Sequence, residues 1–268
     1  MQEKSEPIGR IKSVFDEISV NYDKHADTFE EKVESYVTWE HLKEYLPENK
    51  DATILDAGGG TGKWALPLAR LGYRVVLCDI SKGMLRQAEE KIRKEGLSDK
   101  VEIKEVDITN LPFGDNTFDF VFCEGGPVSI SDSQSVISEL GRVLKREGKV
   151  WATVTGRYPL ALKEMRRDSK KAIKLVRSET NFIPYKGIER NRIFSPEEIK
   201  MLFRQNGIEV IRLYGDRIIT LFLPEEVKAK KNYNEVFFSE IAEIALLLSE
   251  EPSVLGIAES LKIVGKKR

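Results

Sequence analysis

The stretch Ile54-Leu-Asp-Ala-Gly-Gly-Gly-Thr-Gly-Lys-Trp64 decides the fold, because an apolar strand runs here into a glycine-rich turn that begins a helix. Glycine at positions 58, 60 and 62 permits positive φ and leaves no side chain in the way of a ligand. The first turn of the following helix offers free backbone N–H groups. The pattern predicts a ligand held close to the backbone; a tight turn without a ligand is the plainer alternative.

Outward from this stretch, short apolar runs alternate with amphipathic segments, which is the pattern of a parallel sheet covered by helices. The expected strands are Thr53–Ala57, Arg74–Asp79, Val101–Val106, Phe118–Cys123, Lys149–Thr155, Ile208–Tyr214 and Leu261–Val264. The expected helices between them are Lys63–Leu71, Gly83–Lys94 and Ser133–Leu144. The sequence therefore predicts an α/β fold.

Two segments lie outside this alternation. Residues 1–50 carry apolar positions at helical spacing and are predicted to form a helical N-terminal cap on a core of residues 51–268. Residues 156–194 interrupt the core with a helix expected over Leu160–Arg177 and an aromatic loop holding Phe182 and Tyr185, and we interpret this insertion as a lid. Directly after it, Ser195-Pro-Glu-Glu198 has the residues of a helix-initiating capping box.

Carboxylates follow the next two strands. Asp79 ends the strand after the glycine turn, where a carboxylate accepts hydrogen bonds from both hydroxyls of a ribose. Asp107 begins Asp107-Ile-Thr-Asn-Leu-Pro-Phe-Gly-Asp-Asn-Thr-Phe-Asp119, and an acceptor at this position is placed to meet an adenine amino group. Three successive strand ends thus carry groups suited to a ligand that contains adenosine.

The glycine turn by itself does not select one nucleotide. Gly60-x-Gly62-x-x-Ala65 satisfies the relaxed dinucleotide-binding fingerprint, so a nicotinamide-dependent oxidoreductase or a non-catalytic nucleotide-binding module stays open. The P-loop of ATPases is excluded. Ala57 stands where its first glycine would be, and Trp64 stands at the Ser/Thr position that binds Mg²⁺.

Together these segments resemble the successive cofactor motifs of class I S-adenosylmethionine-dependent methyltransferases, and most of all the methyltransferase type 11 and ubiquinone and menaquinone biosynthesis branch. Phe15–Asp23, Glu139–Lys145 and Leu261–Lys267 also resemble segments of that branch. The resemblance spans nearly the whole chain and is weakest at residues 156–194 and 216–260. It implies a Rossmann-like, doubly wound sheet of seven strands, the last one antiparallel, with S-adenosyl-L-methionine as cofactor and S-adenosyl-L-homocysteine as product.

Carried over position by position, the resemblance assigns residues to each part of the cofactor. Its methionine end would meet Asp56, Gly58, Gly60 and Gly62, its ribose Asp79, its adenine ring Ile80 and Met84, and its adenine amino edge Asp107 and the backbone of Ile108. Tyr22 would close over it from the cap. Met84 is equally well explained as a core residue at the start of a helix.

The acceptor of the methyl group is the open question. Glu124, at the end of the fourth strand beside the expected methyl group, is the candidate catalytic base that a hydroxyl or carbon acceptor would need; its plainer role is to hold the cofactor's amino group. The segment Glu124–Ile130 matches no substrate-diagnostic motif, and Lys145-Arg-Glu-Gly148 departs from the family's usual Lys-Pro-Gly-Gly turn. A small-molecule acceptor is expected, because cap and lid would enclose a pocket.

A basic run keeps RNA or protein open as a second acceptor class. Between Arg157 and Arg177 eight Lys and Arg residues face two acidic residues, a net charge of +6. Such a run is commonly a solvated helix face, but it also attracts anionic acceptors such as RNA. Methylation of an adenine amine is disfavoured, because the Asn/Asp-Pro-Pro-Tyr type of motif is absent after the fourth strand.

Composition sets the outer limits. The formal net charge is −1, so the chain as a whole does not attract nucleic acid or anionic membrane. Cys78 and Cys123 lie in separate apolar runs, so no disulfide or metal site is expected, arsenic methylation is disfavoured and a reducing, cytoplasmic location fits best. The longest apolar stretch, Ile241–Leu248, is too short to span a bilayer. Oligomeric state and pathway stay open.

Overall fold

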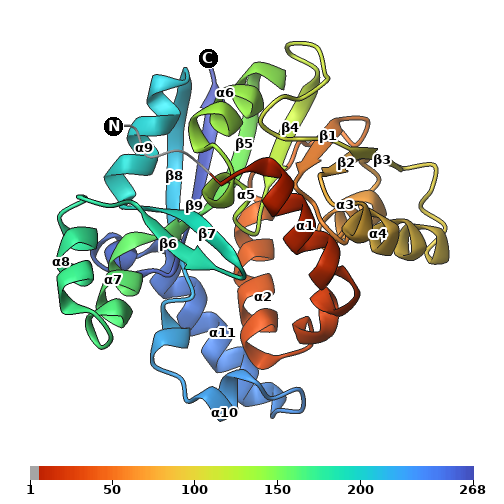
Figure 1. Cartoon of the computed structure of the whole chain (residues 1–268). Coiled ribbons are helices and arrows are strands. Elements are labelled where there is room, and N and C mark those ends of the chain that lie inside the picture. The colour runs from red at the N-terminus through yellow and green to blue at the C-terminus, as the bar shows by residue number, and fades with distance from the viewer. Residues whose placement is uncertain (1–5) are drawn as a thin grey trace.

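The computed structural model describes residues 6–268, so the first five residues of the predicted cap lie outside the described part. Figure 1 shows a central sheet with helices on both faces. The strands are β1 (Thr53–Ala57), β2 (Arg74–Asp79), β3 (Val101–Glu105), β4 (Phe118–Cys123), β5 (Leu144–Gly156), β6 (Phe182–Tyr185), β7 (Ile188–Phe194), β8 (Ile208–Asp216) and β9 (Ser260–Lys267).

Helices connect and cover these strands. The α-helices are α1 (Ile8–Ile18), α2 (Phe29–Lys43), α3 (Ala65–Arg70), α4 (Lys82–Lys94), α5 (Pro127–Ile130), α6 (Ser133–Val143), α7 (Arg157–Met165), α8 (Ser169–Val176), α9 (Pro196–Gln205), α10 (Glu225–Lys228) and α11 (Glu235–Glu250). Short 3₁₀ helices are η1 (Ser19–His25), η2 (Ile219–Leu221) and η3 (Pro252–Ile257). The capping box at the start of α9 is confirmed, with both of its hydrogen bonds present.

The predicted parallel sheet with an antiparallel last strand is confirmed. Strands β3, β2, β1, β4 and β5 lie side by side and run parallel. β9 pairs with β5 and β8 and runs antiparallel to both, as the resemblance implied for the last strand. Because parallel strands end at the same edge, the loops after β1, β2 and β4 meet there.

The two faces of the sheet bury different residues. One face packs under α6 and α9 through residues such as Leu55, Val121 and Ile263. The other face packs under α2, α3 and α4 through residues such as Ile54, Phe122 and Trp151. Consecutive strand residues alternate between the faces, as the pleat requires. Asp56 and Thr153 therefore belong to the second face, the one that carries the polar site described below.

The predicted count of seven strands was wrong, because residues 6–268 form nine strands. The extra strands, β6 and β7, form an antiparallel hairpin joined to the end of β5. Its turn has positive φ at Lys186 (48°) and Gly187 (80°), the conformation that joins two strands tightly. Lys-Gly is a weak sequence signal for such a turn, so the sequence predicted an aromatic loop in place of the hairpin.

The single helix expected over Leu160–Arg177 was also wrong. The chain breaks it into α7 and α8, because the Asp168 side chain accepts a hydrogen bond from the backbone N–H of Lys171 and so begins a new helix. In Figure 1 these two helices lie side by side at the left edge of the molecule.

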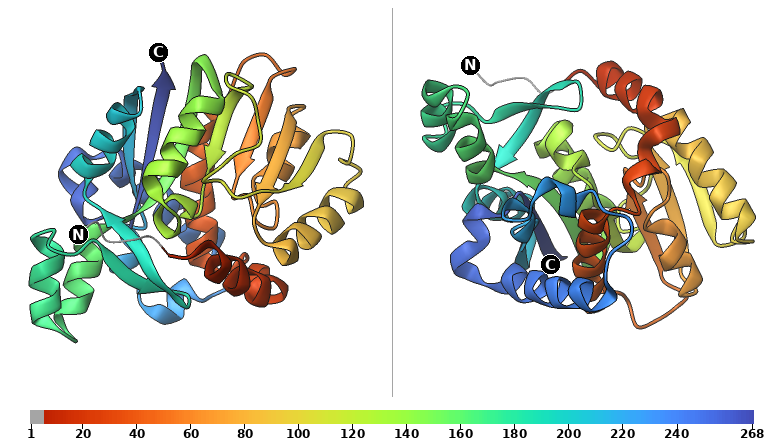
Figure 2. Two further views of the ribbon diagram at one scale, coloured as in Figure 1. Left: turned by 45° about the horizontal axis from the view of Figure 1, so that its top comes forward. Right: turned by 90° about the horizontal axis from the view of Figure 1, so that it is seen from below.

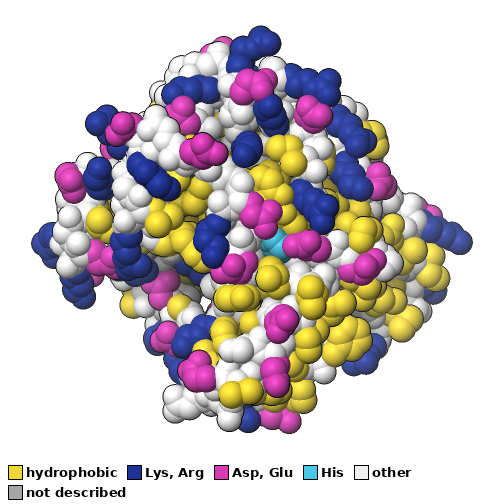
Figure 3. Space-filling model, turned by 180° about the vertical axis from the view of Figure 1, so that it is seen from behind, with side chains coloured by type: hydrophobic (Ala, Val, Ile, Leu, Met, Phe, Trp, Pro, Cys, Tyr) yellow, Lys and Arg dark blue, Asp and Glu magenta, His cyan; other side chains and the backbone are white. Residues whose placement is uncertain are grey.

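Helix α1 lies across the carboxyl edge of the sheet, and α2 packs on its second face. Figure 2, seen from below, shows α1 beside α4 and α2 beside α11. Figure 3, seen from behind, shows Lys and Arg interspersed with Asp and Glu in the upper half and a broad apolar band in the lower half. No helix within residues 6–268 is both long and apolar enough to cross a membrane.

Candidate functional site

A cavity of about 590 Å³, counting the part open to solvent, lies where β1, β2 and β4 end. Its walls come from the cap, the strand-end loops and α5. The lining residues are Ile8, Ile11, Phe15, Tyr22, Gly58, Gly60, Asp79, Ile80, Met84, Val106, Ile108, Glu124, Gly125, Pro127, Ile130 and Ser131. Its mostly apolar wall with a few polar groups is typical of a small-molecule site.

The glycine turn forms the floor of this cavity in the way its sequence predicts. Gly58 and Gly60 have φ of 73° and 55°. The N–H of Gly58 donates to the carbonyl of Cys78 over 2.8 Å, which ties the turn to β2. A Cβ at Gly60 would meet no atom within 4 Å, whereas one at Gly58 would lie 2.6 Å from Pro127. Gly60 therefore leaves open space beside the backbone, and Gly58 permits the close contact with α5.

Asp79 joins the turn to the end of β2. Its two carboxylate oxygens accept hydrogen bonds from the N–H of Gly60 (3.0 Å) and of Ser81 (2.8 Å). Burial raises the pKa of Asp79, while these backbone donors lower it. The carboxylate is thus fixed in orientation on the cavity wall and retains lone pairs for a diol.

Asp56 lies beneath the turn and not on the cavity wall. It is 1% exposed, and a Cβ on Gly59 would lie 2.6 Å from its carboxyl carbon. Burial and the neighbouring charge of Asp79 raise the pKa of Asp56 to about 7, and its buried Oδ2 has no hydrogen-bond partner among the described residues. Asp56 therefore supports the turn from below.

Two more of the predicted cofactor residues do not line the cavity. Gly62 packs against α4, where a Cβ would lie 3.4 Å from the Cβ of Ala88. The Asp107 carboxylate accepts hydrogen bonds from the backbone and hydroxyl of Thr109 and so closes its own turn, while its neighbours Val106 and Ile108 reach the wall. Met84 is 1% exposed and also lines the cavity, so it serves both the core and the wall.

Glu124 lines the same cavity from the end of β4. Its Oε2 accepts hydrogen bonds from the Trp151 indole (2.6 Å) and the Thr153 hydroxyl. Its Oε1 is buried and has no hydrogen-bond partner among the residues described. Burial raises the pKa of Glu124, and the ammonium of Lys262 partly offsets that rise. One carboxylate oxygen is held in place, and the other is left for a donor from outside the protein.

Helix α1 is fastened to the loop after β2, a contact that sequence reasoning missed. Asp16 accepts hydrogen bonds from the Ser81 hydroxyl (2.7 Å) and the Gly83 N–H (2.9 Å), at the start of α4. Lys12 donates to the carbonyl of Ile80 over 2.8 Å. Asp16, an acid among the apolar positions of α1, was a signal of this contact in the sequence. Its partner Ser81, however, lies 65 residues away. These bonds hold the apolar residues of α1 over the cavity.

The β6–β7 hairpin reaches the same place from the other side. Ile188 is completely buried and packs with Ile11, Val14 and Ile130. The Lys186 ammonium lies 5.2 Å from the centre of the Tyr22 ring. Helix α1 and the hairpin thus meet beside the cavity, and the hairpin also contacts Tyr22.

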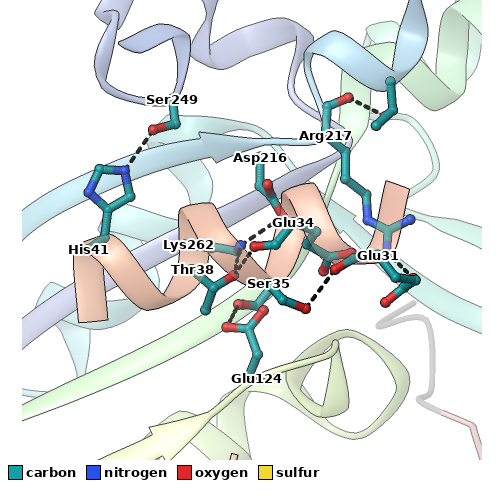
Figure 4. Close-up of polar contacts among 12 residues, drawn as sticks. Glu31, Glu34, Ser35, Thr38, His41, Glu124, Asp216, Arg217, Ser249 and Lys262 are labelled. Carbon is teal, nitrogen blue, oxygen red and sulfur yellow. Dashed lines mark hydrogen bonds and ion pairs between the residues drawn. The ribbon is translucent and has the colours of Figure 1, made fainter. Parts of the chain in front are cut away.

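A buried group of charged residues behind Glu124 was not predicted at all. Lys262 on β9 is fully buried and pairs with Asp216 over 2.8 Å. Glu34 on α2 pairs with Arg217, and Figure 4 shows these four residues around α2 with Glu124 below the helix. The sequence carries one signal of this group, Lys262 within the otherwise apolar strand Leu261–Val264. The resemblance to a closing strand gives no reason for a lysine there.

Comparison with known proteins agrees with this geometry. A family described as a methyltransferase domain matches residues 54–148, which hold the glycine turn, Asp79, Asp107 and Glu124. The demethylmenaquinone methyltransferase of Bacteroides fragilis is 30% identical over 161 residues, covering 56% of this chain and 63% of that protein. The ubiquinone/menaquinone biosynthesis C-methyltransferase UbiE of Klebsiella pneumoniae is 37% identical over 101 residues, covering 37% of this chain and 40% of that protein.

Solved structures share the fold over almost the whole chain. A methyltransferase from Thermotoga maritima superposes with a TM-score of 0.62 at 19% identity, covering 96% of this chain and all of that one. The [4+2]-cyclase SpnF superposes with a TM-score of 0.64 at 18% identity, covering 98% of each chain. A methyltransferase domain thus matches residues 54–148, and the relatives and the shared fold support a class I S-adenosylmethionine-dependent methyltransferase.

Proposed function

We propose that this protein transfers a methyl group from S-adenosylmethionine to a small, largely apolar acceptor held in the cavity under α1. One observation carries the proposal. The cavity joins the glycine turn and Asp79 to an apolar wall made by α1 and α5, and Glu124 stands between them. The acceptor itself is the finer part of the proposal, because this chain spans 63% of the menaquinone relative and 40% of the ubiquinone relative.

The residues present fit the cofactor. Gly60 leaves the space that a ligand beside the backbone needs, and Asp79 would accept the ribose hydroxyls. Ile80, Met84 and Ile108 supply an apolar slot for the adenine ring. The unpartnered Oε1 of Glu124 is an acceptor for a donor that the protein does not provide. Asp56 and Gly62 would act by shaping the turn, and Asp107 by holding Ile108 in place.

When bound, S-adenosylmethionine supplies a methyl group carried on a sulfonium sulfur, and the neutral thioether that remains is the leaving group. The protein's contribution is then positioning, because an in-line displacement needs the acceptor atom aligned with the methyl group. Tyr22, α1 and the β6–β7 hairpin would hold the acceptor and exclude water. We therefore assign residues 6–50 and 156–194 the roles of cap and lid.

Glu124 has two roles to choose between. The menaquinone and ubiquinone relatives are named for methylation in quinone biosynthesis, and the second is named a C-methyltransferase. A carbon acceptor must lose a proton, and a buried carboxylate with a raised pKa is suited to take it. We assign Glu124 as that base for an aromatic, quinone-like acceptor; the alternative is that its free oxygen binds the cofactor's amino group.

The test is calorimetric titration of the protein with S-adenosylmethionine, S-adenosylhomocysteine and NAD, followed by methyl-transfer assays on demethylated quinones. Micromolar binding of the first two and methylation of a quinone ring carbon are the expected results. Preference for NAD would refute the cofactor assignment. Binding without methyl transfer to any small acceptor would direct attention to non-methylating chemistry, for which the shared fold of the [4+2]-cyclase SpnF is a precedent.

RNA remains the second candidate acceptor, on account of α7 and α8. Arg157 does not belong to a basic surface, because it is 1% exposed and pairs with Glu198. Among the described residues, however, Arg166, Arg167, Lys170 and Lys174 have no carboxylate within 4.0 Å. RNA binding that weakens steeply with salt and is lost when these four residues are changed to glutamine would favour this candidate.

A further inference from the structure

Glu124 belongs to a row of polar side chains that crosses the sheet. Its neighbour on β5 is Thr153, which donates a hydrogen bond to it. Thr153 lies opposite Lys262 in the antiparallel pairing of β5 with β9, and Lys262 lies opposite Tyr214 on β8. Directly opposite residues of antiparallel strands place their side chains side by side on one face. The register therefore sets Lys262 one strand beyond the residue that holds Glu124.

Lys262 is a buried ammonium with more acidic neighbours than an ordinary ion pair has. It is 0% exposed, pairs with Asp216 over 2.8 Å, and donates a hydrogen bond to the Thr38 hydroxyl on α2. An unpaired charge in such a place is strongly destabilising, so a buried lysine is retained only where its charge is compensated. Asp216 accounts for one negative charge, and Glu34 and Glu124 add two more nearby.

The other charged groups around Glu124 are either acidic or engaged elsewhere. Asp56 faces it from β1 and Glu34 from α2, while Asp216 on β8 pairs with Lys262. Cys123, next to it on β4, is a buried thiol whose pKa burial raises. Arg217 is held by the carboxylates of α2, namely Glu30, Glu31 and Glu34. Lys262 is thus the cation that the fold brings to the Glu124 side of this group (Figure 4).

We propose that Lys262 is a positioning residue for Glu124, supplying the positive charge against which the Glu124 carboxylate stays ionised while its free oxygen serves the cavity. Without that charge, burial beside Asp56 and Glu34 would favour the protonated form, which is neither a base nor a partner for an ammonium group. Asp216 and Thr38 hold the lysine in place. Because Thr38 and Glu34 come from α2, the cap takes part in setting the charge state of the site.

This inference rests on the proposed function for its meaning, but its test needs neither cofactor nor methyl transfer. The carboxyl carbon of Glu124 is followed by ¹³C NMR over a pH titration of the ligand-free protein, and its signal is assigned by its disappearance in Glu124→Gln. A shifted titration then supports the role of Lys262 even if no methyl acceptor is found. Methyl transfer, in turn, can succeed with the titration unmoved.

Three variants separate electrostatic support from mere structural pairing. Lys262→Met combined with Asp216→Asn removes both buried charges and avoids an orphaned carboxylate; the Glu124 pKa is expected to rise by about one unit. Asp216→Asn alone removes the carboxylate that shares the charge of Lys262. The whole positive charge then acts on Glu124, so the Glu124 pKa should fall. Lys266→Met, on the same strand and same face but paired with Glu147, should change nothing.

An unchanged Glu124 titration in a folded double variant would overturn the proposal and leave Lys262 as the counter-ion of Asp216 alone. If the double variant fails to fold, Asp216→Asn still decides. A fall in the Glu124 pKa supports the proposal, and no change or a rise contradicts it.

Discussion

The proposed cofactor half and the proposed acceptor half of this molecule are built by different means. The cofactor half, from β1 to β4, uses backbone groups of one glycine turn and single side chains at successive strand ends. The acceptor half uses side chains from α1, α2, the hairpin and the last two strands, which meet only in the folded chain. The first half can therefore be recognised from local motifs, and the matched family contains it and extends through α5 and α6 to the start of β5.

The largest effect that separates the halves is expected at Glu124, where they join. Glu124→Gln keeps the shape and the acceptor of the Thr153 hydrogen bond but removes the base, so methyl transfer at saturating cofactor should fall about 100-fold or more. Cofactor affinity, measured by calorimetry, should change little. If the affinity for S-adenosylmethionine falls while the rate at saturating cofactor is unchanged, Glu124 belongs to the cofactor half and binds the cofactor's amino group.

Asp79→Ala should damage the cofactor half alone. Loss of a charge-assisted partner for the ribose, and of the bond that orients the turn through Gly60, should weaken S-adenosylmethionine binding about 10- to 100-fold. The acceptor's KM should stay near its wild-type value. Glu102→Ala, an exposed acid on the neighbouring strand β3, is the matched control and should bind the cofactor normally.

Ile188→Ala should damage the acceptor half alone. Its side chain is completely buried where the hairpin meets α1, so truncation is expected to lower the free energy of unfolding by about 2–4 kcal/mol. The acceptor's KM should rise, with cofactor affinity kept. Ile173→Ala, at a 51% exposed position on α8, is the control. Denaturant titration should show no loss of stability, and kinetics should show no change in the acceptor's KM. Equal losses for cofactor and acceptor would show that the halves are not separable.

The smallest expected effect is a pH dependence of stability with opposite sign in the two halves. Burial lowers the pKa of His41, on α2, to about 4. Its Nε2 contacts the Ser249 hydroxyl, which itself donates to a carbonyl, so the neutral ring donates from Nε2. The folded state thus resists protonation, and stability should fall by about 1–2 kcal/mol as the pH drops from 7 to 5. His41→Gln should flatten that fall.

Asp56 should act the other way. Its folded pKa of about 7 lies above the ordinary value of 3.8, so the folded state holds a proton that the unfolded chain has lost. This group's contribution to stability therefore declines as the pH rises from about 4 to 7, and Asp56→Asn should remove the decline. Chemical denaturation across this range measures both variants, and a common sign for the two would contradict the assigned protonation states.

The same contrast explains how far the sequence could predict the molecule. The strands around the glycine turn, Asp79 and the antiparallel last strand follow from local patterns, and eight of the predicted site residues line one cavity, namely Tyr22, Gly58, Gly60, Asp79, Ile80, Met84, Ile108 and Glu124. The hairpin was missed because its turn is Lys-Gly. Lys262 and Thr38 are 224 residues apart, and only the register of β9 brings the lysine behind Glu124.

The most direct test is a crystal structure with S-adenosylhomocysteine and a quinone-like acceptor. The ribose should lie on Asp79, the adenine between Ile80, Met84 and Ile108, and the acceptor ring against α1 with Glu124 Oε1 within hydrogen-bond reach of the carbon or hydroxyl that reacts. An acceptor bound outside this cavity, or a cofactor that leaves Asp79 without a ribose contact, would contradict the division of the site into these two halves.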